Sequence, residues 1–237
     1  MSKRLTRNCP FAILLFSFAP LASPAQAVAP GGTCPEKCVA AVDCDDKINC
    51  STDTCTVDVC SNEVTTSCPD CTGDGQKDYC VESVTVSKNW SDTTAWPEMT
   101  SGFPGDSNGR CGLIARVLDG ASITLDTDAT MNEGRIISEG TVFVTGNHAL
   151  SVPEGTVLIT GGGRYLADPD TGAGTTASLS ARDILLQSTG CGVAPEMIIS
   201  QSMTVTTTGT ASTTTVGAPD AAHPKMASRS IIESPGA

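Results

Sequence analysis

Apolar and polar residues alternate over short runs in the middle of the chain, and one such run occurs twice. Glu139–Gly146 (EGTVFVTG) is followed by Glu154–Gly161 (EGTVLITG), and the two copies begin 15 residues apart (154 − 139). A weaker copy, Glu133–Ser138, precedes both. Alternation bounded by glycine is typical of β-strands. Repetition at a fixed offset indicates stacked β-units, because one unit alone cannot bury its apolar face.

The repeat predicts an interior that is lined by one face of each strand. Val142 and Val144 share a face, as do Val157 and Ile159. We expect these four side chains to form aliphatic stacks at the strand spacing of about 4.8 Å. Similar patterns predict further strands over Cys80–Val86, Leu113–Leu118, Ala121–Leu125, Arg135–Ser138, Thr141–Thr145, His148–Val152, Thr156–Thr160, Tyr165–Ala167, Leu179–Gln187, Met197–Ser200 and Met203–Thr207.

These strands predict an all-β fold, in which a small disulfide-rich N-terminal segment precedes a β-solenoid. The turns at Asp119-Gly120 and Gly146-Asn147 also suit two-residue hairpins. An antiparallel β-sandwich is therefore the alternative fold.

The first 27 residues have the composition of a secretory signal peptide. Three basic residues up to Arg7 precede an apolar run over Phe11–Leu21, and Ala25–Ala27 is a small-x-small cleavage site. The apolar run is well short of the ~20 residues that span a bilayer. We predict that residues 1–27 are a Sec-type signal peptide, that the mature chain has no transmembrane segment, and that it is secreted or lies at the cell surface.

Charge narrows the class of partner. The formal net charge of −12 becomes −15 when the three basic residues of the signal peptide are removed. Nucleic acids and anionic membranes need clustered Lys and Arg, so neither is an expected partner. The acidic balance suits either divalent cations or simple solubility.

Cysteines crowd into one segment. Of 12 cysteines, 11 remain after the signal peptide is removed (12 − 1), and nine of them lie between Cys34 and Cys80. This density in an exported chain indicates disulfides, whose pairing does not follow from spacing. We predict that residues 28–80 are stapled by disulfides, each contributing typically ~2–4 kcal/mol. The odd cysteine points to an intermolecular bond or to a shortened chain.

Part of this segment has a recognisable spacing. The run from Asp43 to Cys55 (DCDDKINCSTDTC) resembles the cysteine-rich repeats of slime-mould extracellular matrix proteins, and the resemblance covers about residues 43–60. The pattern C-D-D-x-x-x-C-[TS]-x-D-x-C is met by Cys44, Asp45, Asp46, Cys50, Ser51, Asp53 and Cys55. The resemblance implies a matrix or cell-surface spacer.

An acidic loop follows and is a candidate calcium site. Gly75 occupies the sharp turn, and the candidate ligands at positions 1, 3, 5 and 9 are Asp70, Thr72, Asp74 and Asp78. The loop, residues 70–78, is similar to the calcium loops of thrombospondin type 3 repeats. Val81 stands at position 12, where a bidentate Glu is usual, so we expect weak binding. An Asp-Gly turn between two cystines is the alternative interpretation.

Two tryptophans precede the predicted strands. The matching positions are Trp90, Asp92, Trp96, Pro104, Gly105 and Asp106. They resemble the entry segment of G8-like and right-handed β-helix extracellular domains, and the resemblance covers about residues 86–166. It implies a capped β-solenoid of surface proteins. We expect both indoles to cover the end of the solenoid; a carbohydrate-binding module that stacks sugars on Trp90 and Trp96 is the alternative.

No combination of residues predicts catalysis. His148 and His223 are the only histidines, and zinc sites need clustered ligands. Asp126 and Asp128 are the available acid pair for glycoside chemistry, but at this spacing in a turn we expect them to be solvated. We therefore predict a protein that is not an enzyme.

The predicted organisation is a signal peptide (1–27), a cysteine-rich segment (28–80), a β-solenoid-like domain (81–208) and a Thr/Ser/Pro-rich disordered tail or truncated continuation (209–237). The predicted function is structural display or adhesion at the cell surface, with a surface or matrix polysaccharide or protein as partner. The alternative is the N-terminal part of a polysaccharide-active β-helix enzyme whose catalytic coils lie further along a longer chain.

Overall fold

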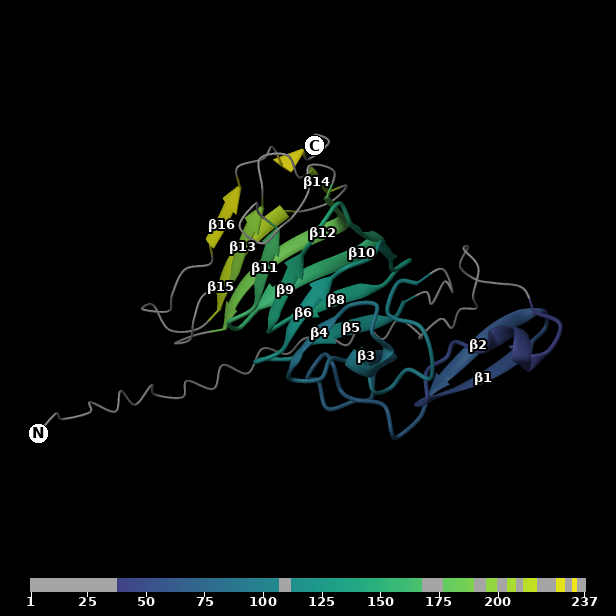
Figure 1. Ribbon diagram of the computed structural model, residues 1–237. Coiled ribbons are helices and arrows are strands. Elements are labelled where there is room, and N and C mark those ends of the chain that lie inside the picture. The colour runs from purple at the N-terminus through teal and green to yellow at the C-terminus, as the bar shows by residue number, and fades with distance from the viewer. Residues whose placement is uncertain are drawn as a thin grey trace, which may run out of the picture.

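The computed structural model describes residues 38–106, 112–167, 177–189, 195–199, 204–207, 211–216, 225–228 and 232–233. Within these residues the helical segments are two short 3-10 helices, η1 (Ala41–Cys44) and η2 (Thr93–Ala95), and the remaining regular structure is β (Figure 1). A two-stranded antiparallel hairpin precedes two larger sheets, in which the paired strands run parallel. The all-β prediction is therefore confirmed, and the antiparallel sandwich is wrong.

The chain passes alternately between the two parallel sheets. The larger sheet has the order β17-β14-β12-β10-β8-β5-β3, with β15 also beside β12 and β7 beside β10. Its strands are β3 (Cys80–Glu82), β5 (Ile114–Val117), β7 (Ala129–Thr130), β8 (Arg135–Ser138), β10 (Ala149–Thr160), β12 (Ser178–Thr189), β14 (Thr204–Thr207), β15 (Ala211–Val216) and β17 (Ile232–Glu233). The smaller sheet has the order β16-β13-β11-β9-β6-β4. Its strands are β4 (Ser87–Asn89), β6 (Ser122–Leu125), β9 (Thr141–Val144), β11 (Arg164–Ala167), β13 (Glu196–Ile199) and β16 (Lys225–Ser228).

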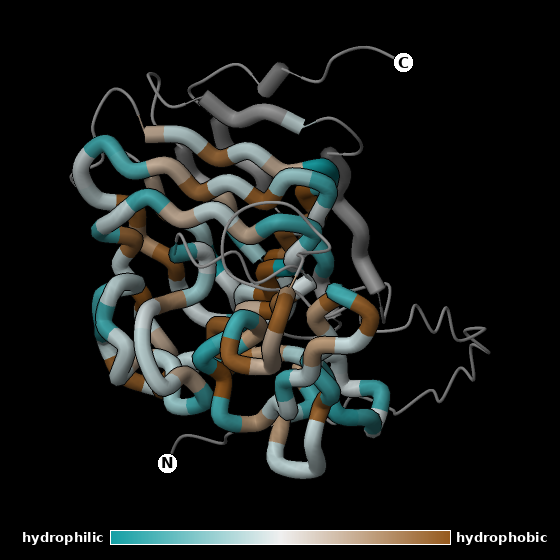
Figure 2. The backbone as a smooth tube through the Cα atoms, turned by 90° about the vertical axis from the view of Figure 1, so that its right-hand side faces the viewer, coloured by the Kyte–Doolittle hydropathy of each residue, from teal (hydrophilic) through white to brown (hydrophobic). Residues whose placement is uncertain are grey.

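One apolar cluster joins the inner faces of both sheets. Val142 and Val144 of β9 and Val157 and Ile159 of β10 belong to it, and each is at most 1% exposed. The prediction that these four side chains line an interior is confirmed. Their neighbours in sequence alternate with them, as the hydropathy along the tube in Figure 2 shows. Period-two alternation thus buries one face of each strand and leaves the other outside.

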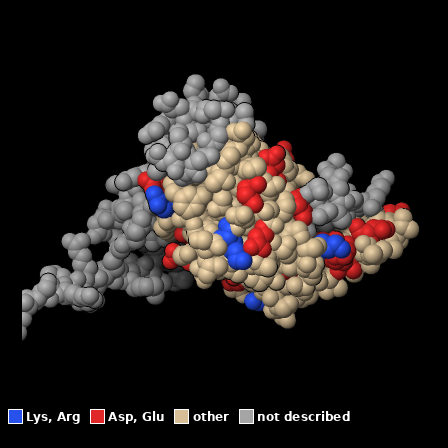
Figure 3. All heavy atoms as spheres, in the orientation of Figure 1, with Lys and Arg blue, Asp and Glu red and all other residues tan. Residues whose placement is uncertain are grey.

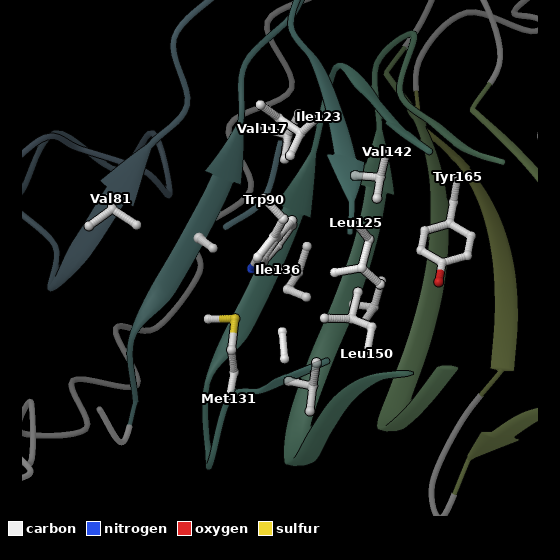
Figure 4. Close-up of a cluster of buried hydrophobic side chains, with 14 of the residues drawn as sticks. Val81, Trp90, Val117, Ile123, Leu125, Met131, Ile136, Val142, Leu150 and Tyr165 are labelled. Carbon is white, nitrogen blue, oxygen red and sulfur yellow. The ribbon is translucent and has the colours of Figure 1, made fainter. Parts of the chain in front are cut away.

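Side chains from the two sheets meet inside this interior. Figure 4 shows Ile123 and Val142 of the smaller sheet together with Ile136 and Leu150 of the larger one. All four are at most 1% exposed. The small aliphatic side chains that dominate the composition therefore suffice for this thin core.

The two copies of the repeat are not stacking neighbours, which corrects the sequence prediction. Glu139–Gly146 contains β9 of the smaller sheet, whereas Glu154–Gly161 contains the second half of β10 in the larger sheet. Thr156 of β10 pairs with Arg135 of β8, 21 residues earlier (156 − 135). The weaker copy is therefore the true neighbour, and the 15-residue offset is the step from one sheet to the other.

The cysteine-rich segment forms a hairpin held by disulfides. Strands β1 (Ser51–Thr56) and β2 (Val59–Val64) are joined by Val57 and Asp58, whose φ values are 54° and 61°. The four disulfides are Cys38–Cys55, Cys44–Cys60, Cys50–Cys68 and Cys71–Cys80. The predicted disulfide stapling is confirmed for these eight residues. Cys34, Cys111 and Cys191, and with them the predicted odd cysteine, lie outside the described residues.

The hairpin segment packs against the first strands of the parallel sheets. Cys50 and Cys68 belong to the same apolar cluster as the sheet interior, and Ile48 forms an antiparallel bridge with Met99. In Figure 1 the hairpin extends away from the sheets on the side of β3. The disulfide-rich segment therefore closes one end of the shared core and projects beyond it.

Strand boundaries differ from the prediction in three places. The predicted strands His148–Val152 and Thr156–Thr160 form one strand, β10, with an irregular register between them. The predicted strand Cys80–Val86 ends at Glu82. Beyond Thr207, where sequence composition predicted no strand, β15, β16 and β17 pair in parallel with earlier strands. Threonine is β-branched and suits strands, so pairing partners decide the structure of this Thr-rich segment.

Tyr165 offers a direct test of the interior. Its hydroxyl is buried without a hydrogen-bond partner, and burial raises the pKa of the phenol. A buried donor without a partner costs about 1–3 kcal/mol, so Tyr165→Phe should raise the melting temperature of the oxidised chain. Tyr165→Leu is the matched control: it also removes the hydroxyl but leaves a cavity, and should lower the melting temperature. A Phe variant less stable than the wild type would contradict the burial of this ring.

Candidate functional site

Asp70 organises the loop predicted to bind calcium. Its carboxylate accepts hydrogen bonds from three backbone amides, those of Gly73 (2.7 Å), Asp74 (3.2 Å) and Gly75 (2.8 Å). Asp78 accepts one from the amide of Thr72 at 2.7 Å, and Asp74 one from the amide of Gln76 at 2.8 Å. The carboxylates therefore fold the loop through its own backbone.

The loop is fixed to the larger sheet at two points. The disulfide Cys71–Cys80 joins it to the first residue of β3. Arg116 of β5 donates from Nη1 to the carbonyl oxygen of Asp70 at 3.3 Å. The same guanidinium pairs with Glu82 and Glu139, each at 2.9 Å. This network connects the cysteine-rich segment to the parallel strands.

A different acidic cluster brings its carboxylates closer together. Carboxylate oxygens of Asp45, Asp46 and Asp53 all lie within 4.8 Å of one another. In the described part of the chain, Asp70, Asp74 and Asp78 form no such convergent group. Sequence analysis quoted Asp45, Asp46 and Asp53 only as markers of a matrix repeat, although that pattern already contains all three acids.

Burial separates the roles of the cluster's carboxylates. Asp46 is 1% exposed and accepts hydrogen bonds from the Ile48 amide (2.8 Å), the Ser51 hydroxyl (2.7 Å) and the Asn62 side-chain amide (3.0 Å). Asp45 pairs with Lys47. Asp53 keeps one buried oxygen, Oδ1, without a hydrogen-bond partner. Burial, together with the charge of Asp46, raises the pKa of Asp53 to about 6.

The raised pKa predicts a pH-dependent stability. Above pH 6 the ionised Asp53 destabilises the fold, and stability should increase as the pH falls from about 6 towards the unfolded value near 4, because the folded state then binds the extra proton. Asp53→Asn should therefore raise the melting temperature at pH 7 by the equivalent of about 1 kcal/mol, a figure reduced for the partial solvation of the carboxyl.

Comparison of the two proteins across pH provides the control for this prediction. The difference between Asp53→Asn and wild type should shrink when the melts are repeated at pH 4, since Asp53 is then protonated in the wild-type fold. A difference that stays constant between pH 4 and pH 7 would show that the charge of Asp53 is not the cause.

The two tryptophans lie inside the apolar cluster. Both are 0% exposed, and their rings meet edge to face with centroids 5.0 Å apart. Trp90 Nε1 donates to the carbonyl of Pro104 at 2.7 Å, and Trp96 Nε1 donates to the carbonyl of Trp90 at 3.0 Å. Neither indole presents a face to solvent, so neither stacks on a sugar in this structure. The arrangement is that of a structural pair next to the first strands.

The acids considered for glycoside chemistry are occupied by local contacts. Asp126 accepts hydrogen bonds from the amide (3.0 Å) and the hydroxyl (2.7 Å) of Ser91. Asp128 accepts from the amide of Ala149 at 2.8 Å and lies 3.7 Å from Nδ1 of His148. These bonds attach the tryptophan loop to the turn after β6, and the turn to β10.

Charges of both signs are mixed over the visible surface. In Figure 3 the Lys and Arg side chains of the described residues lie beside Asp and Glu. Besides the Arg116 network, the pairs include Lys88–Asp92 (3.1 Å) and Arg164–Glu196 (2.8 Å). The described face in this view therefore carries no basic patch of the kind that nucleic acids need.

Comparison with known proteins identifies no relative. No family model, curated protein or solved structure matches the chain. Among the residues that the structure describes, no helix is long and apolar enough to cross a bilayer. Function must therefore be argued from the fold and its residues.

Proposed function

We propose that the protein is a secreted or cell-surface structural protein, in which a cysteine-rich spacer is joined to a β-solenoid that displays its outer faces for adhesion. The observation that carries this proposal is the alternation of the chain between two parallel sheets around one apolar core. Each further passage adds strands without changing the cross-section, which is how solenoids build long, rigid surfaces.

The disulfides support an extracellular location. Four disulfides lie within residues 38–80, and such density persists in oxidising compartments. The predicted signal peptide at residues 1–27 would direct the chain there. An adhesive partner is proposed to be a surface or matrix polysaccharide or protein.

Location and adhesion are tested separately. Intact producing cells should be labelled by a membrane-impermeant reagent, or should release the chain, and mass spectrometry should find a mature N-terminus near Val28. A surface coated with the oxidised chain should retain cells better than one coated with the reduced, denatured chain. Recovery of the unprocessed chain from the cytoplasm, or equal cell retention on both surfaces, would overturn the proposal.

Calcium binding by Asp70, Thr72, Asp74 and Asp78 stays a prediction of the sequence. Binding to the folded state should raise the melting temperature in calcium over chelator, by about 2.7 kcal/mol of stability at a hundredfold excess over the Kd. Asp74→Ala should abolish the effect, whereas Asp53→Asn, in the other acidic cluster, should leave it unchanged. Identical melts with calcium and with chelator would make the loop an ordinary Asp-Gly turn.

A further inference from the structure

A pocket of about 250 Å³ lies on the outer face of the larger sheet. Its floor includes Ile137 of β8 and Leu158 of β10, which pair in register. Both are buried, at 4% and 8% exposure, yet neither belongs to the apolar cluster between the sheets. Thr72 and Gly73 of the acidic loop form a wall beside them. The pocket thus forms where the disulfide-held loop meets the parallel strands.

Arg135 is the unusual charge in this pocket. Among the arginines whose side chains the structure describes, Arg116, Arg164 and Arg182 each pair with a carboxylate at 2.8–2.9 Å. Arg135 has no such pair, and its Nε is buried without a hydrogen-bond partner. Burial lowers the pKa of this guanidinium, and the charge of Asp78 offsets the effect only in part. A desolvated cation without a bonded counter-ion is costly, so the free protein bears a penalty that an anion would remove.

The other lining groups specify the rest of a ligand. Thr160 and Gln187 place a hydroxyl and an amide on the rim, and such groups bond hydroxyls of either donor sense. Glu139 also lines the pocket, but its carboxylate is held by Arg116 through bonds of 2.9–3.1 Å. Arg135 is therefore the lining cation that is free to meet a carboxylate, next to an apolar floor and a neutral polar rim.

We infer that this pocket binds a hydroxylated carboxylate of about one sugar ring in size, with Arg135 paired to the carboxylate, Ile137 and Leu158 under its apolar face, and Thr160 and Gln187 bonded to hydroxyl groups. Its volume is slightly below the usual range for drug-sized ligands, which suits a single unit. The inference goes beyond the proposed structural function and does not depend on adhesion or on export.

The test measures binding of glucuronate and glucose to the oxidised full chain by calorimetry or ligand-observed NMR. Glucuronate should bind about tenfold more tightly than glucose, since a guanidinium–carboxylate pair adds a charge-assisted bond that glucose lacks. A glucuronate oligosaccharide distinguishes the sources: tighter binding than the monomer indicates a polymer, and equal binding indicates a free hydroxy acid.

Variants assign the binding to this pocket. Arg135→Gln should lose the preference for glucuronate, while Arg182→Gln, which removes an exposed arginine of the same sheet, should keep it. Melting curves check that both variants fold, and Arg135→Gln should melt no lower than wild type without ligand because the desolvated charge is gone. Glucuronate should raise the wild-type melting temperature alone. Equal affinities for glucuronate and glucose, absence of binding, or full retention by Arg135→Gln would each overturn the inference.

Discussion

Val144→Asp should leave the parallel sheets unfolded at 25 °C. Val144 is 0% exposed inside the apolar cluster and pairs in register with Leu125 of the neighbouring strand. An aspartate there would bury a charge without a partner, which costs at least several kcal/mol. That is most of the ~5–15 kcal/mol that stabilises an ordinary domain. The measurement is circular dichroism and thermal melting of the oxidised chain, where the cooperative transition of wild type should be lost.

Thr141→Asp is the matched control, because it adds the same charge three positions earlier on the same strand. Thr141 is partly exposed and pairs with Arg164 of β11, so the new carboxylate meets water and a neighbouring guanidinium. This variant should melt within about 0.5 kcal/mol of wild type, as surface substitutions usually do. A folded Val144→Asp protein, or equal losses in both variants, would disprove the assigned interior.

Alternation made the faces of the strands predictable. At Val142 and Val144 the side-chain period of two is a local property, so residue type alone indicates which face is buried. The same reasoning placed Arg135–Ser138 correctly as a strand. The pairing of strands was not predictable in this way. Arg135 meets Thr156 because of the length of chain that makes one full passage, and the stronger local repeat pointed to a different neighbour.

The site residues depend still more on tertiary contacts. Asp53 lies seven residues after Asp46, and the two carboxylates meet because β1 returns beside the turn that contains Asp45 and Asp46. Spacing does not determine disulfide pairing, so that return was not predictable. The missing partner of Arg135 is likewise a property of its surroundings. The burial of Trp90 is different, since a large aromatic next to the first predicted strand already favoured a structural role.

The Glu-Gly pairs of the repeat have a steric explanation that leads to the second large effect. A Cβ at Gly155 would lie 2.0 Å from the carbonyl oxygen of Gly134 and 2.7 Å from Cγ1 of Val152. Gly163 makes the same approach, at 2.0 Å from the carbonyl oxygen of Ser138. Glycine is therefore required where one passage of the chain crosses closely over the preceding one.

Gly155→Ala should destabilise the oxidised chain by about 3 kcal/mol or more, because backbone atoms must move apart and the β8–β10 pairing beside them is disturbed. Gly161→Ala is the control. Gly161 has a φ of 59° and no atom within 4 Å of an added Cβ, so alanine costs only the left-handed conformation, about 1–2 kcal/mol. Denaturant titrations of both variants measure the difference. If Gly155→Ala were as stable as Gly161→Ala, the close crossing would be wrong, and with it the account of why Glu-Gly recurs before successive strands.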